Sequence, residues 1–323
     1  MSNPSRHEGN SSFGSVERLD SALDALLDVE ARAEEVCTGF IWSEGPVWRN
    51  GALFFSDVPA NILYRWRPGS AKAELFLEPS GGIPSNPDFV EAGSNGLALD
   101  SEGRLLLCQS GGRRVVRLEE NDHTEVVLAD RFEGRRFNNP NDLVCHSSGA
   151  VYFSDPSYGF KGHEASPLRE MPWNGVYRIA LDRTVDLLIR DLPVPNGLAF
   201  SPDERTLYVA VSDSRLPRVM AFDVRADGLL GTGRLFFDAV PLVKRGLQGT
   251  CDGLKVDIRG NVFTTAPGGL AVLSPEGKLL GTILLGVASN CAWGGDGSTL
   301  YITADDLVCR IQTATHGTPF RFP

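Results

Sequence analysis

The sequence predicts an all-β protein built as a six-bladed β-propeller, and three observations support this. One short phrase recurs six times along the 323-residue chain, at intervals of 38–56 residues. Each copy reads as two β-strands joined by a polar turn, and further alternating apolar segments follow most copies. No segment between these strands sustains a helical period. Six repeats of about four strands each are typical of a β-propeller.

The repeated phrase begins with a residue that carries a side-chain oxygen, here called the lead residue. A few apolar residues, a turn rich in Asp, Ser, Pro and Gly, and a second β-rich segment follow it. The six copies are SEGPVWRNGALFFSD (43–57), SNGLALDSEGRLLLCQ (94–109), PNDLVCHSSGAVYFSD (140–155), PNGLAFSPDERTLYVA (195–210), CDGLKVDIRGNVFTTA (251–266) and SNCAWGGDGSTLYITA (289–304). Their lead residues are Glu44, Asn95, Asn141, Asn196, Asp252 and Asn290.

Third and fourth strands are expected after these pairs. Third strands are predicted at 62–66, 115–118, 176–179, 219–223, 270–273 and 307–311, and fourth strands at 73–78, 124–129, 184–189 and 279–285. The last repeat has no good fourth strand of its own. Residues 36–42, which precede the first repeat, are expected to pair there and close the ring, because an open propeller would expose strand edges.

The region before the propeller has a different pattern. Residues 1–14 are polar, and the segment 15–36 places Leu19, Leu23, Leu26 and Leu27 at helical spacing, which predicts a short helix packed on the ring. The predicted organisation is therefore a polar N-terminal extension with a short helix (1–35), followed by a six-bladed β-propeller catalytic domain (36–323).

Composition narrows the class of function. Hydrophobic residues make up 42% of the chain, as in a folded globular protein, and the formal net charge is −10. This charge disfavours binding to nucleic acid or to an anionic membrane. No apolar run reaches the roughly 20 residues of a membrane span, and the N-terminus lacks the apolar core of a signal peptide, so a cytoplasmic location is expected. No particular oligomeric state is predicted.

The lead residues are the candidate site. The first strand of a propeller blade lines the central channel, so six lead residues should meet at one end of it. Single Asn or Asp residues often serve only as turn residues, but Glu44 is a poor one. Two uncompensated carboxylates there would be costly unless they were protonated or bound to a cation. Oxygen ligands favour one divalent cation, Ca²⁺ before Mg²⁺ or Zn²⁺, held by Glu44, Asn141, Asn196 and Asp252.

A serine-hydrolase arrangement is not indicated by the sequence. Ser110, in the segment QSGGR, lacks a nucleophile elbow, and the five histidines are scattered. His146 occupies the turn position that Asp100 and Asp257 hold in other repeats, which predicts a turn residue. Arg113 and its neighbour Arg114 are interpreted as a solvated strand entry.

In its motifs the chain resembles the calcium-dependent sugar lactonases, which comprise the gluconolactonases and the senescence marker protein also called regucalcin. The resemblance covers about residues 40–312 and rests on SEGPVW (43–48), NPNDLV (139–144), YFSDPSYG (152–159), PNGLAFSPD (195–203) and DGLKVD (252–257). It implies a six-bladed propeller whose metal is held at Glu44, Asn196 and Asp252, with Asn141 at or beside the ion. Two positions depart from this family: Asn139 stands where regucalcin-type relatives have Arg, and Ser110 where bacterial relatives often have His.

The expected reaction is hydrolysis of a gluconolactone-like sugar lactone to the aldonic acid. Asp252 is the candidate catalytic residue, either as general base or only as metal ligand, and Asn95 and Asn141 are candidate substrate-binding residues. Tyr158 is expected to line the pocket, and the loop 80–88 to cover its mouth. Asp155 and its counterpart Asp57 are assigned structural roles. The alternatives are a propeller that hydrolyses organophosphates or aliphatic lactones, and a non-catalytic calcium-binding or protein-binding propeller.

Overall fold

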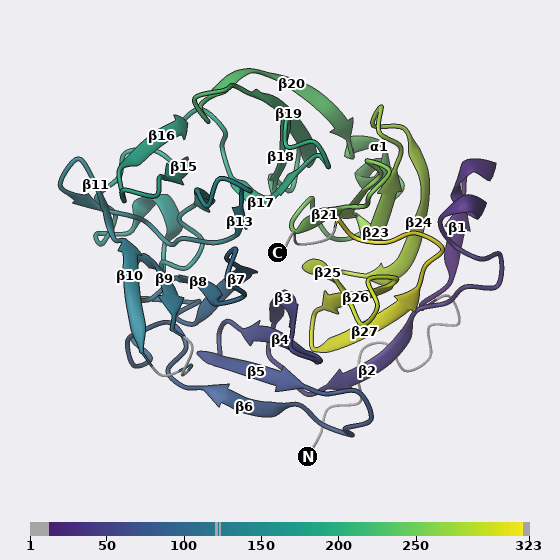
Figure 1. Ribbon diagram of the computed structural model, residues 1–323, viewed down its shortest axis with the longest axis horizontal. Helices are drawn as coiled ribbons and strands as arrows, with labels where there is room; N and C mark the ends of the chain where they lie inside the picture. Colours follow the sequence, from purple (N-terminus) through teal and green to yellow (C-terminus); the bar gives the residue numbers. More distant parts are fainter. Residues whose placement is uncertain (1–12, 120–121, 123, 319–323) are drawn as a thin grey trace.

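The computed structural model describes residues 13–119, 122 and 124–318, so residues 1–12 of the expected extension lie outside it. In this part of the chain, six antiparallel sheets of four or five strands are arranged as blades around a central channel (Figure 1). The innermost strands of consecutive blades contact one another all the way round the ring. The six-bladed β-propeller predicted from the repeats is confirmed.

Each repeat supplies one blade, and its strands run in chain order from the channel outward. Blade 1 consists of β3 (Ser43–Arg49), β4 (Ala52–Asp57), β5 (Ile62–Trp66) and β6 (Glu74–Leu77), and blade 2 of β7 (Ser94–Leu99), β8 (Leu105–Gln109), β9 (Arg114–Leu118) and β10 (Glu125–Ala129). Blade 3 consists of β13 (Leu143–Cys145), β14 (Val151–Asp155), β15 (Gly175–Ile179) and β16 (Val185–Ile189), and blade 4 of β17 (Pro195–Phe200), β18 (Thr206–Val211), β19 (Arg218–Val224) and β20 (Leu230–Asp238). Blade 5 consists of β21 (Leu254–Val256), β22 (Val262–Ala266), β23 (Gly268–Leu273), β24 (Leu279–Gly286) and β1 (Val16–Arg18), and blade 6 of β25 (Asn290–Gly294), β26 (Thr299–Ala304), β27 (Leu307–Gln312) and β2 (Glu34–Thr38).

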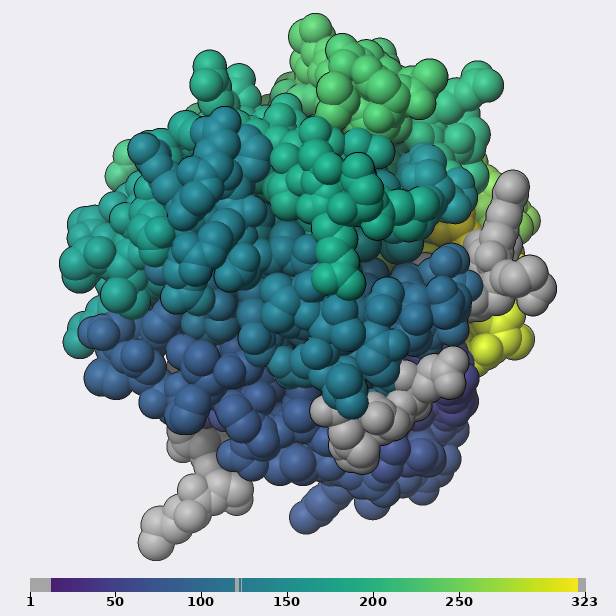
Figure 2. All heavy atoms as spheres, turned by 60° about the vertical axis from the view of Figure 1, so that its left-hand side comes forward, coloured from purple at the N-terminus to yellow at the C-terminus, as the bar shows by residue number. Residues whose placement is uncertain are grey.

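The core consists of six apolar layers, one between each pair of neighbouring blades. Because each blade packs on both of its faces, strands such as β4 and β8 are buried along their whole length. Between blades 1 and 2, for example, Phe54 and Leu107 belong to one buried cluster. Figure 2 shows one outer face of the molecule, where segments coloured in sequence order lie against one another. Truncating Leu107 to Ala should cost about 2–5 kcal/mol of stability.

The ring closes by pairing the two ends of the propeller. β2 forms the outermost strand of blade 6 and pairs antiparallel with β27, which confirms the closure expected for residues 36–42. The strand already ends at Thr38, four residues earlier than expected. The chain turns here because the backbone N–H groups of Ile41 and Trp42 donate to the carboxylate of Asp57, at 3.0 and 3.2 Å.

The helix expected within residues 15–36 is replaced by β1 and a five-residue 3₁₀ helix, η1 (Ser21–Ala25). β1 pairs with β24 as the fifth strand of blade 5, and the backbone N–H groups of Leu19 and Asp20 donate to Leu280 O. Pairing with the blade therefore uses the backbone groups that a longer helix would need. Leu23 and Leu27 are buried against blades 5 and 6, as the apolar spacing suggests, but Leu19 is 50% exposed.

The remaining short elements lie in loops between blades or at their edges. They are the hairpin β11 (Arg131–Phe132) and β12 (Arg135–Arg136), the 3₁₀ helix η2 (His163–Ala165) and the helix α1 (Val240–Lys244). In the described residues, no helix has the length and apolar character needed to cross a membrane.

Candidate active site at one end of the channel

The lead residues meet at the end of the channel where the innermost strands begin. Asn290 donates from Nδ2 to Glu44 Oε2 at 3.1 Å, and the side chain of Asn196 donates to Asp252. The side chains of Glu44, Asn95, Asn141, Asn196 and Asn290 are buried, whereas Asp252 is half-buried. The structure thus brings together the residues that the repeats single out.

A glycine follows the lead residue in four of the six copies, and the structure shows why. A Cβ atom at Gly45 would lie 2.1 Å from the carbonyl oxygen of Asn95, and one at Gly197 would lie 2.3 Å from that of Asp252. Each glycine therefore lets the innermost strand of one blade approach the lead residue of the next. In the repeated phrase, the lead residue supplies a polar side chain, and the glycine after it allows the strands to approach closely at the channel end.

Asp142 is a third carboxylate of this site that the sequence analysis missed. It takes the place of the glycine in the third copy and is 2% exposed. Its Oδ1 accepts from Leu143 N at 2.8 Å, and its Oδ2 accepts from Asn290 Nδ2 at 3.4 Å. The available signal was the break in the repeat: a carboxylate stands where four other copies require glycine.

Burial raises the pKa of all three carboxyl groups. The pKa of Glu44 rises to about 8, first because of burial and then because of the negative charge of Asp142. Burial, followed by the charges of Glu44 and Asp142, raises the pKa of Asp252 well above its usual range. Burial also raises the pKa of Asp142. The anionic forms are costly here unless a cation is bound among them.

The oxygen atoms without hydrogen-bond partners at this end are suitable ligands for a hard cation. Asn141 Oδ1 and Asp252 Oδ1 are fully buried and have no hydrogen-bond partner among the described residues. In the same part of the chain, no group of three or more His, Cys, Asp or Glu residues is placed to hold a metal. Carboxylates alone therefore do not form a metal centre, but the predicted set of two carboxylates and two carboxamides supplies the oxygen ligands that Ca²⁺ accepts.

Asp57 and Asp155 hold the chain just before two of the lead residues. Asp57 accepts from the N–H groups three and two residues before Glu44. Asp155 Oδ2 accepts from Asn138 N at 2.8 Å, three residues before Asn141, and the N–H group of Asn139 also donates to this carboxylate. These contacts confirm the structural roles expected for both aspartates, and they position the side chains of Glu44 and Asn141.

A cavity of about 420 Å³ opens beside the site. The hydroxyl of Tyr158 faces Asn196 and Ser212, and Ser212 in turn donates to Cys251 O, next to Asp252, at 2.7 Å. The oxygen of Tyr158 is buried without a well-formed hydrogen bond in the described structure, so it is available to a ligand. The lining residues are Tyr158, His163, Glu164, Val194, Ser212, Asp213, Ser214 and Arg215. The predicted place of Tyr158 in the pocket wall is confirmed.

The segment 80–93 packs against the loop that carries Tyr158. Val90 N donates to Gly159 O at 2.9 Å, and the rings of Phe89 and Phe160 lie 5.5 Å apart. This segment brings in Glu91, a half-buried carboxylate that the sequence analysis missed. Burial raises the pKa of Glu91 to about 7, and its charge acts on both Asp252 and Tyr158. Glu91 therefore lies close enough to the site to influence its charges.

The two positions that depart from the lactonase pattern lie together below this segment. Asn139 Nδ2 donates to Ser110 O at 3.3 Å, and both residues are buried. The interpretation of Arg113 as a solvated residue is wrong. Arg113 is 4% exposed, donates from Nε to Phe137 O at 2.6 Å and pairs with Glu170 at 3.1 Å, so it braces the loop before Asn141.

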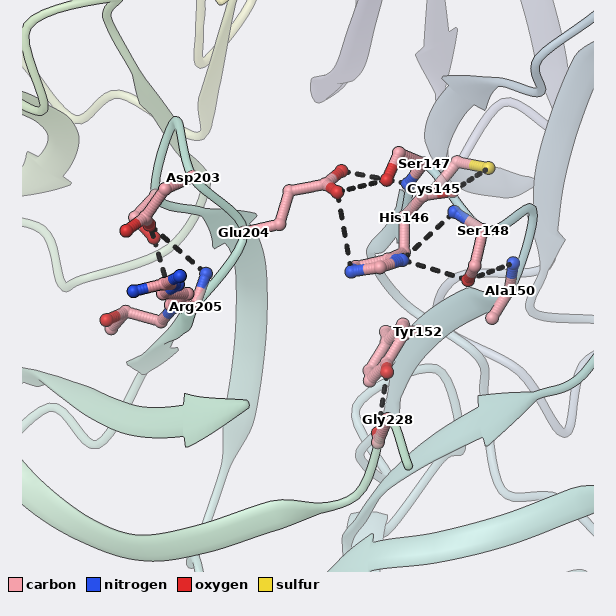
Figure 3. Close-up of polar contacts among 12 residues, drawn as sticks. Cys145, His146, Ser147, Ser148, Ala150, Tyr152, Asp203, Glu204, Arg205 and Gly228 are labelled. Carbon is pink, nitrogen blue, oxygen red and sulfur yellow. Dashed lines mark hydrogen bonds and ion pairs between the residues drawn. The ribbon is translucent and has the colours of Figure 1, made fainter. Parts of the chain in front are cut away.

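A Ser–His–Glu chain exists elsewhere in the molecule, after the ends of the innermost strands β13 and β17 and so at the opposite end of the channel. Figure 3 shows its contacts. Ser148 Oγ lies 2.9 Å from His146 Nδ1, and His146 Nε2 lies 3.4 Å from Glu204 Oε2. The same Nδ1 also accepts from Ser148 N at 3.0 Å, which is what a turn aspartate does. The role predicted for His146 as a turn residue is confirmed, and the cluster ties the first turns of blades 3 and 4 together.

Comparison with known proteins shows the family of this chain. A family model described as the SMP-30/gluconolactonase/LRE-like region matches residues 42–306. A gluconolactonase from Zymomonas mobilis is 40% identical over 321 residues, which is 95% of this chain and 88% of its own. The lactonase drp35 from Staphylococcus aureus is 28% identical over 246 residues, which is 73% of this chain and 67% of its own.

Two solved structures are also similar. That of a gluconolactonase from Xanthomonas campestris has a TM-score of 0.79 at 31% identity, covering 92% of this chain and 94% of that one. That of regucalcin from Agrobacterium tumefaciens, a calcium-binding protein, has a TM-score of 0.65 at 19% identity, covering 86% and 92%, and supports the fold alone.

The fold and the site define a six-bladed propeller with a buried group of carboxylates and carboxamides at one end of its channel. The family match and the Zymomonas relative place it more narrowly. The chain belongs to the SMP-30/gluconolactonase/LRE-like family.

Proposed function

We propose that the protein is a metal-dependent lactonase that hydrolyses a sugar lactone of the gluconolactone type to the aldonic acid. The observation that carries this proposal is the convergence of Glu44, Asn196 and Asp252, with unpaired buried oxygens, beside an open cavity. The similarity to the Zymomonas gluconolactonase supports the substrate class. The oxygen-only donor set supports Ca²⁺ before Mg²⁺ or Zn²⁺.

Glu44, Asn141, Asn196 and Asp252 are the residues that would hold the cation, which supplies a Lewis acid for the lactone carbonyl when bound. Asp252 orients the attacking water and accepts one of its protons. The water oxygen bonds to the carbonyl carbon, the ring C–O bond breaks, and the ring oxygen takes up a proton to become a hydroxyl. Asn95 and Asn141 hydrogen-bond to the substrate, and the buried hydroxyl of Tyr158 is placed to do the same.

The test is gluconolactone hydrolysis, followed by proton release, with chelator-treated protein and with added Ca²⁺, Mg²⁺ or Zn²⁺. Turnover is expected to disappear on chelation and to return with at least one ion, with Ca²⁺ as the best. Chelated protein that works at the untreated rate would contradict the metal dependence. Absence of turnover with every ion would direct the search to aliphatic lactones and phosphotriesters, and then to a non-catalytic calcium-binding or protein-binding role.

A further inference from the structure

A lysine side chain lies within this acidic site. Lys255 belongs to β21, three residues after Asp252, and it is half-buried. Its Nζ donates to Leu254 O at 3.1 Å and to Asn290 Oδ1 at 3.3 Å. Lysines are rarely buried without a charged or polar partner, so this placement needs an explanation.

Asn290 connects Lys255 to two of the carboxylates. Its Oδ1 accepts from Lys255 Nζ and from Cys291 N, the latter at 2.9 Å. Its Nδ2 therefore faces the other way, and donates to Glu44 Oε2 at 3.1 Å and to Asp142 Oδ2 at 3.4 Å. An amide N–H cannot bind a cation, so this orientation keeps the sixth lead residue out of the ligand set.

The charges in the site add up to a specific value. Glu44, Asp142 and Asp252 carry three negative charges when ionised, and Lys255 carries one positive charge. For these four groups the net charge is then −2, which one divalent cation balances; Glu91, whose charge also acts on Asp252, is the same in all the variants below. The positive charge of Lys255 acts on Asp142, and Asn290, which accepts from Lys255, donates to the same carboxylate.

We propose that Lys255 is a built-in counter-cation and positioning residue of this site: it offsets the charge of Asp142 and orients Asn290, so that the site takes a divalent cation. This proposal rests on the metal-dependent function proposed above. It assigns Lys255 no contact with the lactone. Lys255 sets how strongly the site attracts a cation, and it orients Asn290 so that the amide N–H groups point toward the carboxylates.

The experiment measures cation binding rather than turnover. Isothermal titration calorimetry with Ca²⁺ is run on chelator-treated wild type, Lys255→Met, Asp142→Asn and the double variant. Lys255→Met leaves a net charge of −3, so Ca²⁺ should bind more tightly, on the order of tenfold. Asp142→Asn leaves −1, and binding should weaken by a similar factor. The double variant restores −2 and should return to within about threefold of wild type.

Thermal unfolding of the same chelated proteins is the second measurement. Without a cation, Lys255→Met should unfold at a lower temperature than wild type, and the double variant should recover most of the loss, because its third carboxylate is gone. Lys255→Arg, which keeps the charge, should resemble wild type in both measurements. Lys244→Met is the matched control, because Lys244 is exposed at the end of α1. If Lys255→Met does not fold, Asp142→Asn and the double variant still report the charge effect.

The outcomes separate the two proposals. Equal Ca²⁺ affinities in all four proteins would overturn the role of Lys255 and leave the lactonase function standing. Opposite shifts in the two single variants, in a protein that hydrolyses no lactone, would support Lys255 and contradict the function. Wild-type protein that binds none of Ca²⁺, Mg²⁺ and Zn²⁺ would overturn both.

Discussion

The two ends of the channel carry the same types of side chain but use them differently. One end, here called the turn end, is where the innermost strand of each blade turns into the second strand. There, Asp100 Oδ1 accepts from Glu102 N and Arg104 N, at 3.0 and 2.9 Å, and Asp257 Oδ1 accepts from two turn N–H groups, each at 2.8 Å. At the lead-residue end, burial raises the pKa of Glu44 and Asp252. Backbone N–H groups thus satisfy the two turn carboxylates, whereas Asp252 at the lead-residue end keeps an unpaired oxygen.

The difference arises from the backbone around each group. A turn leaves N–H groups free, and a side chain there can accept from them. At the start of an innermost strand the N–H groups are already engaged: Asn141 N donates to Ser154 O at 2.9 Å, and Asp252 N donates to Thr265 Oγ1 at 2.7 Å. The side chains of Asn141 and Asp252 therefore each keep an unpaired oxygen, which a cation or a substrate can use.

The largest effect is expected for Asp252→Ala, at the lead-residue end. Loss of the side chain that orients water should lower kcat for lactone hydrolysis by about a thousandfold or more, with the fold intact by circular dichroism. Glu204→Gln is the matched control, because it removes a carboxylate charge at the turn end; its kcat should stay within about twofold. Full activity in Asp252→Ala would mean that the catalytic end has been assigned wrongly.

A large effect on stability is expected for Gly197→Ala in β17. The added Cβ would meet the carbonyl oxygen of Asp252 at 2.3 Å, so the innermost strands must separate, at a cost of about 3 kcal/mol or more in urea unfolding. Gly231→Ala, in the outermost strand of the same blade, is the control. Its Cβ would meet only ordinary contacts at 3.6 Å, and stability should change by about 0.5 kcal/mol or less. Equal losses would refute the close approach as the reason for the repeated glycine.

A pH-dependent effect is expected for Glu91→Gln. Folding raises the pKa of Glu91 from 4.5 to about 7, so the cost of burying its charge is absent below about pH 4.5 and grows as the pH rises through 7. The variant should therefore unfold at a higher temperature than wild type at pH 8, by an amount worth about 2 kcal/mol or less, and at nearly the same temperature at pH 4.5. A gain that does not vary with pH would show that the charge is not responsible.

The smallest effect is expected for Ser148→Ala, at the turn end. If the Ser148–His146–Glu204 chain is only a turn contact, lactone and simple ester hydrolysis should both stay within about twofold of wild type. The matching change at the lead-residue end, Ser212→Ala, removes a residue that lines the cavity and should raise KM for the lactone. Loss of hydrolysis in Ser148→Ala alone would make the turn end a second catalytic site.

Several residues show how far sequence reasoning reached. The six lead residues and the four-strand repeat could be predicted because a propeller repeats the same unit along the chain. Asp142 and Lys255 were missed because each looks like an ordinary variation within one copy, and Glu91 because it lies in a loop outside the repeat. Near Leu23 the expected helix is reduced to the 3₁₀ helix η1, because the chain on its N-terminal side pairs as a strand with blade 5.

The sequence by itself determined the number of blades, the order of their strands, the closure of the ring and the positions of the lead residues, because all of these are local patterns repeated at regular intervals. Only the tertiary structure decided which side chains share the channel end and in what electrostatic state. The contacts of Asn290 with Glu44, Asp142 and Lys255 join residues from four blades. Burial and the charge of Asp142 raise the pKa of Glu44, whereas Asn290 and Lys255 oppose this rise. Desolvation and the coupling between charges depend on residues that are far apart in the sequence, so no single segment of the sequence predicts them.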